Sequence, residues 1–306
     1  MNPLPEAALT HALNLCAPQD LPLDLRPRPS AACGGRRKSL GLRWRVASAI
    51  FGLASSAAQA QPALPPPLPT PTPVTVDLLA TQGRLSAGLP DAQAVNLRGT
   101  WLLAGGDVAR AELLAEDKFN SRGGIAALGY TWVLSPDWVT AGTVAVGRGG
   151  PNWANARIDA ELSRSWGEAR AVVTRLALYR ALFDGNRSDR GLRLALVGYL
   201  PGSLVVEAGT ALNISEPGAV HSAMPFVAAT VGQDGQHYLS LRASRGTEAY
   251  QALGDGQPLV NFKSQSIGLT WRRWIAPQWG LVAQAEQYRN PSYTRLSLGV
   301  GAFAQW

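Results

Sequence analysis

Apolar and polar residues alternate one by one in short segments along most of this chain, and helical periodicity is nearly absent. Residues 156–162 read ARIDAEL, which places Ile158 on an apolar face and Arg157 and Asp159 on an ionic one. Residues 295–306 repeat the pattern up to the terminal Trp306. Successive side chains of a β-strand point to opposite faces, so this alternation predicts strands with one apolar and one polar side. The chain is therefore predicted to be all-β.

Such a two-sided strand fits two kinds of protein. In a soluble sandwich the apolar face points to the core and the polar face meets water. In an outer-membrane barrel the apolar face meets lipid and the polar face lines the lumen. The alternation alone does not separate these two folds, but the lengths of the turns and the positions of the aromatic residues do.

The connections between the segments favour the barrel. Short connections at 104–107, 135–137, 166–169, 200–203, 233–236 and 276–278 alternate with longer ones at 148–155, 183–189, 215–221 and 248–261. Short periplasmic turns and longer extracellular loops are typical of an antiparallel up-and-down transmembrane β-barrel. We predict fourteen strands, with twelve as the alternative, centred near residues 80, 98, 113, 128, 143, 161, 175, 194, 209, 227, 242, 268, 284 and 300.

Tryptophan placement supports the same conclusion. All but one of the Trp residues after position 60 lie next to a short turn or at the C-terminus. Indole is favoured where one edge is apolar and the other is wet, so these residues are predicted to form an interfacial girdle. The predicted girdle consists of Trp101, Trp132, Trp138, Trp166, Trp271, Trp274, Trp279 and Trp306.

The first 73 residues differ in composition from the rest. A basic run at 36–45, an apolar stretch at 46–58 and the Ala-Gln-Ala triplet at 58–60 predict an export signal over residues 1–60, with a start codon that is assigned too early. Residues 61–73 hold seven prolines and predict an extended linker. The barrel domain is then expected over residues 74–306.

Removal of residues 1–60 changes the chemistry available to the chain. Seven of the 28 basic and three of the 21 acidic residues leave with it, so the formal net charge falls to +3 and nucleic acid is not an expected partner. Both cysteines, Cys16 and Cys33, leave as well. A thiol-free exported chain suits an oxidising compartment, and no cofactor or metal is predicted, because no His, Asp and Glu cluster has ligand spacing.

Several stretches resemble the YaiO family of outer-membrane β-barrel proteins. They are residues 212–250, 266–281 and 288–295, together with GYTWVLSPDW at 129–138 and LSRSW at 162–166. The resemblance covers residues 92–306 and implies a location in the outer membrane of a Gram-negative bacterium. Some family members look associated with surface polysaccharide systems. The aromatic C-terminal strand also resembles the signal read by the barrel-assembly machinery, so this machinery and outer-membrane lipid are the expected partners.

The polar faces of the predicted strands carry both signs of charge. The charged candidates for the lumen are Arg98, Arg110, Glu112, Arg157, Asp159, Glu161, Arg193, Glu207, Arg242, Arg272, Glu286 and Arg295. Two interpretations stay open for them. They either compensate one another in an ion-pair network that fills a purely structural barrel, or they line a pore or groove for a polar molecule.

The functional hypothesis is a non-enzymatic surface barrel that exports or docks a polar polymer, such as a polysaccharide. An enzyme would have to use one of the two histidines after position 60, His221 or His237. His221 and Ser222 suggest an outer-membrane hydrolase as the alternative, with Glu216 or Asp234 to orient the histidine. His237 follows a hairpin signal and is predicted to be a turn residue, so no catalytic residue is predicted.

Overall fold

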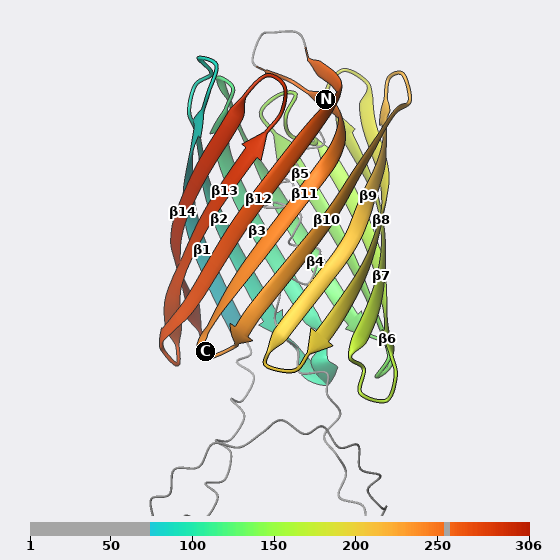
Figure 1. Cartoon of the computed structure of the whole chain (residues 1–306), viewed down its shortest axis with the longest axis vertical. Coiled ribbons are helices and arrows are strands. Elements are labelled where there is room, and N and C mark those ends of the chain that lie inside the picture. The colour runs from blue at the N-terminus through green and yellow to red at the C-terminus, as the bar shows by residue number, and fades with distance from the viewer. Residues whose placement is uncertain (1–73, 254–257) are drawn as a thin grey trace, which may run out of the picture. The chain divides into compact units, whose positions relative to one another are not determined.

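A computed structural model describes residues 74–253 and 258–306, which form a closed barrel of fourteen antiparallel strands (Figure 1). All fourteen predicted strand centres fall inside a strand, which confirms the predicted fold. The strands are β1 (Val74–Leu85), β2 (Ala92–Leu102), β3 (Val108–Lys118), β4 (Ser121–Val133), β5 (Trp138–Arg148), β6 (Ala156–Trp166), β7 (Val172–Phe183), β8 (Arg187–Leu200), β9 (Leu204–Glu216), β10 (Val220–Gln233), β11 (His237–Gln251), β12 (Leu259–Ala276), β13 (Trp279–Arg289) and β14 (Thr294–Gln305).

One short 3-10 turn, η1 (Ala104–Gly106), lies between β2 and β3. The predicted export signal and the Pro-rich linker lie outside the described residues. Within the described ranges, no helix has the length and apolar character needed to cross a membrane.

Pairing of the first strand with the last closes the sheet. The ladder between β1 and β14 runs from Thr75 opposite Gln305 to Leu85 opposite Arg295. The backbone N–H of Val74 donates to the carbonyl of Trp306, and the N–H of Trp306 donates to the carbonyl of Val74, both at 3.0 Å. The sheet therefore has no open edge to leave unpaired backbone groups in lipid.

The two ends of the barrel differ in their connections. We call the end where β1 begins and β14 ends, which carries the C mark in Figure 1, the terminal rim, and the opposite end the far rim. Connections at the terminal rim cover 103–107, 134–137, 167–171, 201–203, 234–236 and 277–278. Those at the far rim cover 86–91, 119–120, 149–155, 184–186, 217–219, 252–258 and 290–293.

Three far-rim connections are tighter than the sequence suggested. The connections expected over 183–189, 215–221 and 248–261 shrink to 184–186, 217–219 and 252–258. The reason is that the ladders continue to the hairpin tips, with Phe183 opposite Arg187 and Ser188 opposite Glu216. Longer connections at this rim are therefore 86–91, 149–155 and 252–258.

The alternation places apolar residues on the outside of the wall. Leu128 and Val300 are 64% and 70% exposed on the outer face. On β6, Ile158 is exposed, whereas the side chains of its neighbours Arg157 and Asp159 are only 10% and 13% exposed inside the barrel. An apolar outer wall and a polar interior match a membrane solvent, which is the reverse of a water-soluble fold.

The outer face predicts a depth-dependent response to charge. Leu128 lies in the middle of β4 and Ala156 at the far-rim end of β6, and both are exposed on the outer face. Leu128→Arg should lower the free energy of unfolding by about 2 to 4 kcal/mol, because it puts a charge near the middle of the bilayer, whereas Ala156→Arg should cost about 0 to 1 kcal/mol. Urea unfolding in lipid vesicles measures both. Equal costs would show that the wall does not face lipid as assigned.

Candidate functional site

The barrel interior holds the charged residues that the sequence singled out. All twelve lie on the inward-facing side of their strands and are buried or half-buried. They are Arg98, Arg110, Glu112, Arg157, Asp159, Glu161, Arg193, Glu207, Arg242, Arg272, Glu286 and Arg295. The structure brings most of them into contact with an opposite charge or an aromatic ring. The residues next to them on the same strand face outward.

The longest group of contacts runs along β6 to β9. Arg175 Nε lies 3.1 Å from Glu161 Oε1, and its Nη1 lies 3.7 Å from Glu207 Oε1. Arg193 Nη2 lies 3.1 Å from the same Glu207 oxygen. Two arginines thus share one carboxylate. Arg175 was absent from the sequence prediction, although its alternation with the exposed residues Leu176 and Leu178 could have placed it inside.

Aromatic rings extend this network to β11. The guanidinium carbons of Arg193 and Arg242 lie 4.6 Å and 3.9 Å from the ring centre of Phe226. On β6 and β7, Arg157 forms an ion pair with Asp159 at 2.6 Å and stacks 4.0 Å from the ring centre of Tyr179. Because the ring face attracts cations, these contacts hold guanidinium groups that have left water.

A second network spans the seam of the barrel. Arg272 on β12 forms an ion pair with Asp77 on β1, and its guanidinium lies 3.5 Å from the ring centre of Phe303 on β14. Arg295 Nη2 forms a further pair with Glu286 at 2.7 Å. Asp77 was not predicted, because its segment has a weak alternation. The side chain of Arg272 covers the inner face of the two strands between its own strand and β1.

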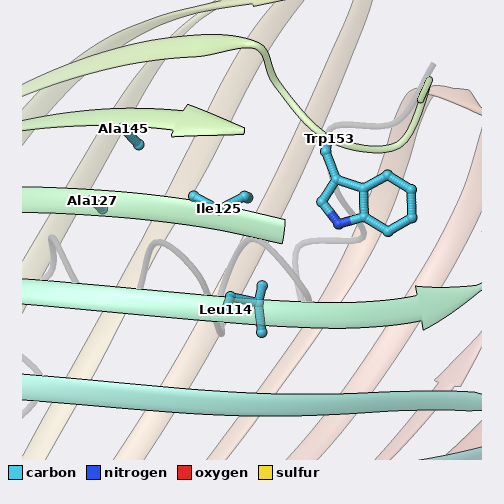
Figure 2. Close-up of a cluster of buried hydrophobic side chains, with 5 residues drawn as sticks. All are labelled: Leu114, Ile125, Ala127, Ala145 and Trp153. Atoms are coloured by element: carbon cyan, nitrogen blue, oxygen red, sulfur yellow. The ribbon is translucent and has the colours of Figure 1, made fainter. Parts of the chain in front are cut away.

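At the far rim, connection 149–155 folds into the mouth of the barrel. Its Trp153 is fully buried against the inward residues Leu114, Ile125, Ala127 and Ala145, as Figure 2 shows. The indole lies close to the wall because position 123 is a glycine, where an added Cβ would lie 2.4 Å from the ring. The buried Lys118 ammonium lies 5.1 Å from the ring centre of Trp153 and 2.7 Å from a carboxylate oxygen of Glu116.

A second cluster of buried residues lies at the mouth beside β13 and β14. The Tyr288 hydroxyl donates to Glu248 Oε1 at 2.8 Å, and Asn290 Nδ2 donates to Gln251 Oε1 at 2.7 Å. Gln251 Nε2 in turn donates to the hydroxyl of Tyr293, whose ring meets Phe119 edge-on at 5.6 Å. Burial raises the pKa of the Tyr293 phenol, so this group stays a neutral partner.

Most predicted girdle residues face outward near the terminal rim. Trp101, Trp132, Trp138, Trp166, Trp279 and Trp306 are exposed on the outer wall, and Trp271 is half-buried on the same face. Arg164 lies between two of them, 5.1 Å from the ring centre of Trp138 and 3.8 Å from that of Trp166.

The prediction for Trp274 is wrong. Its side chain is 9% exposed inside the barrel, where its ring meets Phe303 edge-on at 4.8 Å and Tyr238 at 6.1 Å. Residues three apart on a strand face opposite sides, so Trp271 and Trp274 could not both face lipid. Trp274 is part of the lumen filling near the terminal rim.

The hydrolase alternative also disagrees with the geometry. His221 and Ser222 are consecutive residues of β10, so the histidine is exposed outside the wall and the serine is buried inside. Asp234 lies in the connection at the other rim, where burial raises the pKa of its carboxyl and Arg272 opposes that shift. His237 begins β11 beside this connection. The described ranges contain no group of three or more His, Cys, Asp and Glu that could hold a metal.

An apolar outer wall around an ion-paired interior, in a closed antiparallel barrel, defines a protein of the outer-membrane class. The YaiO membrane beta barrel domain matches residues 75–251, more than half of the chain. The chain belongs to the YaiO family and lies in the bacterial outer membrane. The terminal rim is then periplasmic and the far rim faces the outside, since the three longest connections, 86–91, 149–155 and 252–258, all lie at the far rim and the longer loops of such barrels are extracellular.

Three solved structures are similar to this chain at low sequence identity. The translocator domain of the autotransporter NalP from Neisseria meningitidis is 13% identical, covers 78% of this chain and 90% of its own, and gives a TM-score of 0.43. Omp33 of Acinetobacter baumannii is 10% identical, with 76% and 98% covered and a TM-score of 0.46. An outer membrane channel from Pseudomonas putida F1 is 11% identical, with 81% and 100% covered and a TM-score of 0.45. No curated protein sequence matches this chain.

The two tryptophan environments can be separated by fluorescence. Brominated lipids quench indoles that touch them, so in vesicles of such lipids Trp279→Phe should reduce the quenchable emission. Trp274→Phe should leave the quenchable part unchanged, because its indole is inside the barrel. Heat-modifiable gel mobility checks that both variants fold. A loss of quenchable signal in Trp274→Phe would contradict the inward placement.

Proposed function

We propose that this protein is a non-enzymatic barrel that docks a polar polymer at the outer surface and does not conduct it through the lumen. The observation that supports this proposal is the burial of the lumen charges. In the ion pairs of the two lumen networks described above, no charged side chain is more than 22% exposed. Side chains lining a water-filled channel would be open to solvent, so a filled lumen favours docking over transport.

The filled mouth supports the same choice. Trp153, Lys118, Phe119, Gln251 and Glu248 are among the largest fully buried side chains of the described residues. They come from three far-rim segments that meet inside the mouth. These buried side chains occupy space inside the mouth, which supports binding of a polymer outside it.

A polar surface lies outside this closure. We call it the rim patch, and it consists of the exposed residues Asn120, Arg122, Arg148, Asn155 and Asp184. Asn155 Nδ2 donates to Asp184 Oδ1 at 2.8 Å, which ties connection 149–155 to the hairpin of β7 and β8.

The rim patch offers amide, carboxylate and guanidinium groups that are open to solvent. The Arg122 side chain is 85% exposed and lies 3.2 Å from Asp117. These groups hydrogen-bond to hydroxyl and carboxylate groups, so an exported acidic polysaccharide is the ligand class that they fit best.

Binding to the rim patch is testable with defined polymers. Purified protein should bind polygalacturonate, an acidic polysaccharide, more tightly than neutral dextran. The double variant Arg122→Ala and Arg148→Ala should weaken this binding about fivefold to tenfold, because each exposed charge contact contributes up to about 1 kcal/mol. Arg164→Ala, at the periplasmic rim, is the matched control and should bind as the wild type does. Equal affinity in all three proteins would contradict the proposal.

The closed lumen is testable by conductance. In planar lipid bilayers the wild-type protein should show none of the stepwise openings that an open porin gives under the same conditions. Trp153→Ala removes a large buried side chain from the mouth and should increase the frequency of openings. Trp279→Ala, on the lipid side, should have no such effect. Stable open channels in the wild type would favour transport through the lumen.

A further inference from the structure

Basic side chains collect on the outward face near the far rim. Besides Arg122 and Arg148 of the rim patch, each of the following is exposed and lies within a few residues of the far-rim end of its strand: Arg84, Arg180, Arg190, Lys263 and Arg289. This level of the wall faces the headgroups of the outer leaflet. In the sector from β7 to β10, one of these side chains, Arg190, lines a groove.

Arg180 and Arg190 form a pair of like charges. They lie directly opposite each other on β7 and β8, and both are exposed. Among the described residues, neither makes an ion pair with a protein carboxylate, unlike the arginines of the lumen. Directly opposed like charges destabilise a sheet, because their Cβ atoms are only about 5 Å apart. An anion between the two guanidinium groups would remove this repulsion.

Two rows of outward residues cross the same four strands. The row nearer the outside contains Arg180, Arg190, Ile214 and His221, which are partners in register. The row two residues deeper in the membrane contains Leu178, Leu192, Leu212 and Ala223. The two guanidinium groups of the outer row therefore lie next to an apolar row, which is the order of headgroup and acyl chain in a lipid.

A groove of about 740 Å³ follows these rows on the outer wall. Its lining includes Leu178, Leu212, Ile214 and Ala223, with Arg190 and His221 at the same site. A volume of this size is in the range of small-molecule sites.

The groove lies where the wall is irregular. The ladder between β10 and β11 ends at Phe226 opposite Ser244. Beyond it the N–H of Ala223 donates to the hydroxyl of Thr247 at 3.0 Å in place of a backbone carbonyl. The outer part of β10 therefore lacks its regular ladder to β11 at this place.

We propose that this groove binds one anionic, phosphate-bearing lipid of the outer leaflet. Its phosphate lies between Arg180 and Arg190, where guanidinium groups donate charge-assisted hydrogen bonds to the phosphate oxygens. Its acyl chain packs against Leu178, Leu212 and Ala223. The bound lipid supplies the missing counter-charge, so the site is a specific lipid site and adds to the general hydrophobic contact of the barrel. It does not depend on polymer docking at the rim patch.

Native mass spectrometry of detergent-released protein tests the site directly. With phosphatidylglycerol as the probe, the wild type should retain one lipid, whereas the zwitterionic phosphatidylcholine should be retained about tenfold less. Added inorganic phosphate at the same concentration should not displace the lipid, because it lacks the acyl chain. Displacement by phosphate, or equal retention of both lipids, would overturn the proposal.

Two variants and a control distinguish the contribution of the two arginines to lipid binding from that of the apolar groove. Arg180→Gln with Arg190→Gln should reduce phosphatidylglycerol retention about tenfold or more, and Ala223→Trp should reduce it by filling the groove while both arginines remain. The control Arg84→Gln with Arg289→Gln removes two charges from the outer face of β1 and β13, away from the groove. It should change phosphatidylglycerol retention less than twofold. Heat-modifiable mobility confirms folding of each variant. An equal loss in the control would show general charge attraction only, and the specific site would be refuted.

Discussion

Every backbone N–H and C=O that enters the hydrocarbon of a membrane must find a partner within the protein. In this chain the pairing of β1 with β14 meets that requirement, since it turns a sheet with two open edges into a closed wall. The rest of the structure follows from this closure. The outer face of a closed wall contacts lipid, and its inner face contacts other side chains of the protein. The two faces of each strand therefore lie in environments of opposite polarity.

The interior of the barrel holds charged side chains that are removed from water. Charges that leave water are stable only with partners, and the lumen supplies them as carboxylates shared between arginines and as aromatic rings under guanidinium groups. Glu207 forms ion pairs with both Arg175 and Arg193, and the ring of Phe226 contacts the guanidinium groups of both Arg193 and Arg242. Satisfying the charges in this way also fills the space. The burial of these charges is the observation that supports the proposed action at the outer surface.

Alternation by itself would have prevented the main errors of the sequence prediction. Trp274 was assigned to the girdle from its position beside a turn, although it lies three residues from Trp271 and must face the other way. The pairing of His221 with Ser222 as catalytic partners ignored that neighbours on a strand point apart. The far-rim hairpins at 184–186 and 217–219 were expected to be longer, although the strands continue to their tips.

The sequence alone determined the strand number, the two faces of the wall and the inward placement of the charged residues. These depend on the local geometry of a strand, which sends successive side chains to opposite sides whatever lies around it. Only the tertiary structure decided which charges meet and where the mouth closes. Arg272 reaches Asp77 across 195 positions, and Trp153 reaches Leu114 from a far-rim connection, because closure of the barrel sets the stagger of all fourteen strands. That stagger is a property of the complete ring, and no single segment encodes it.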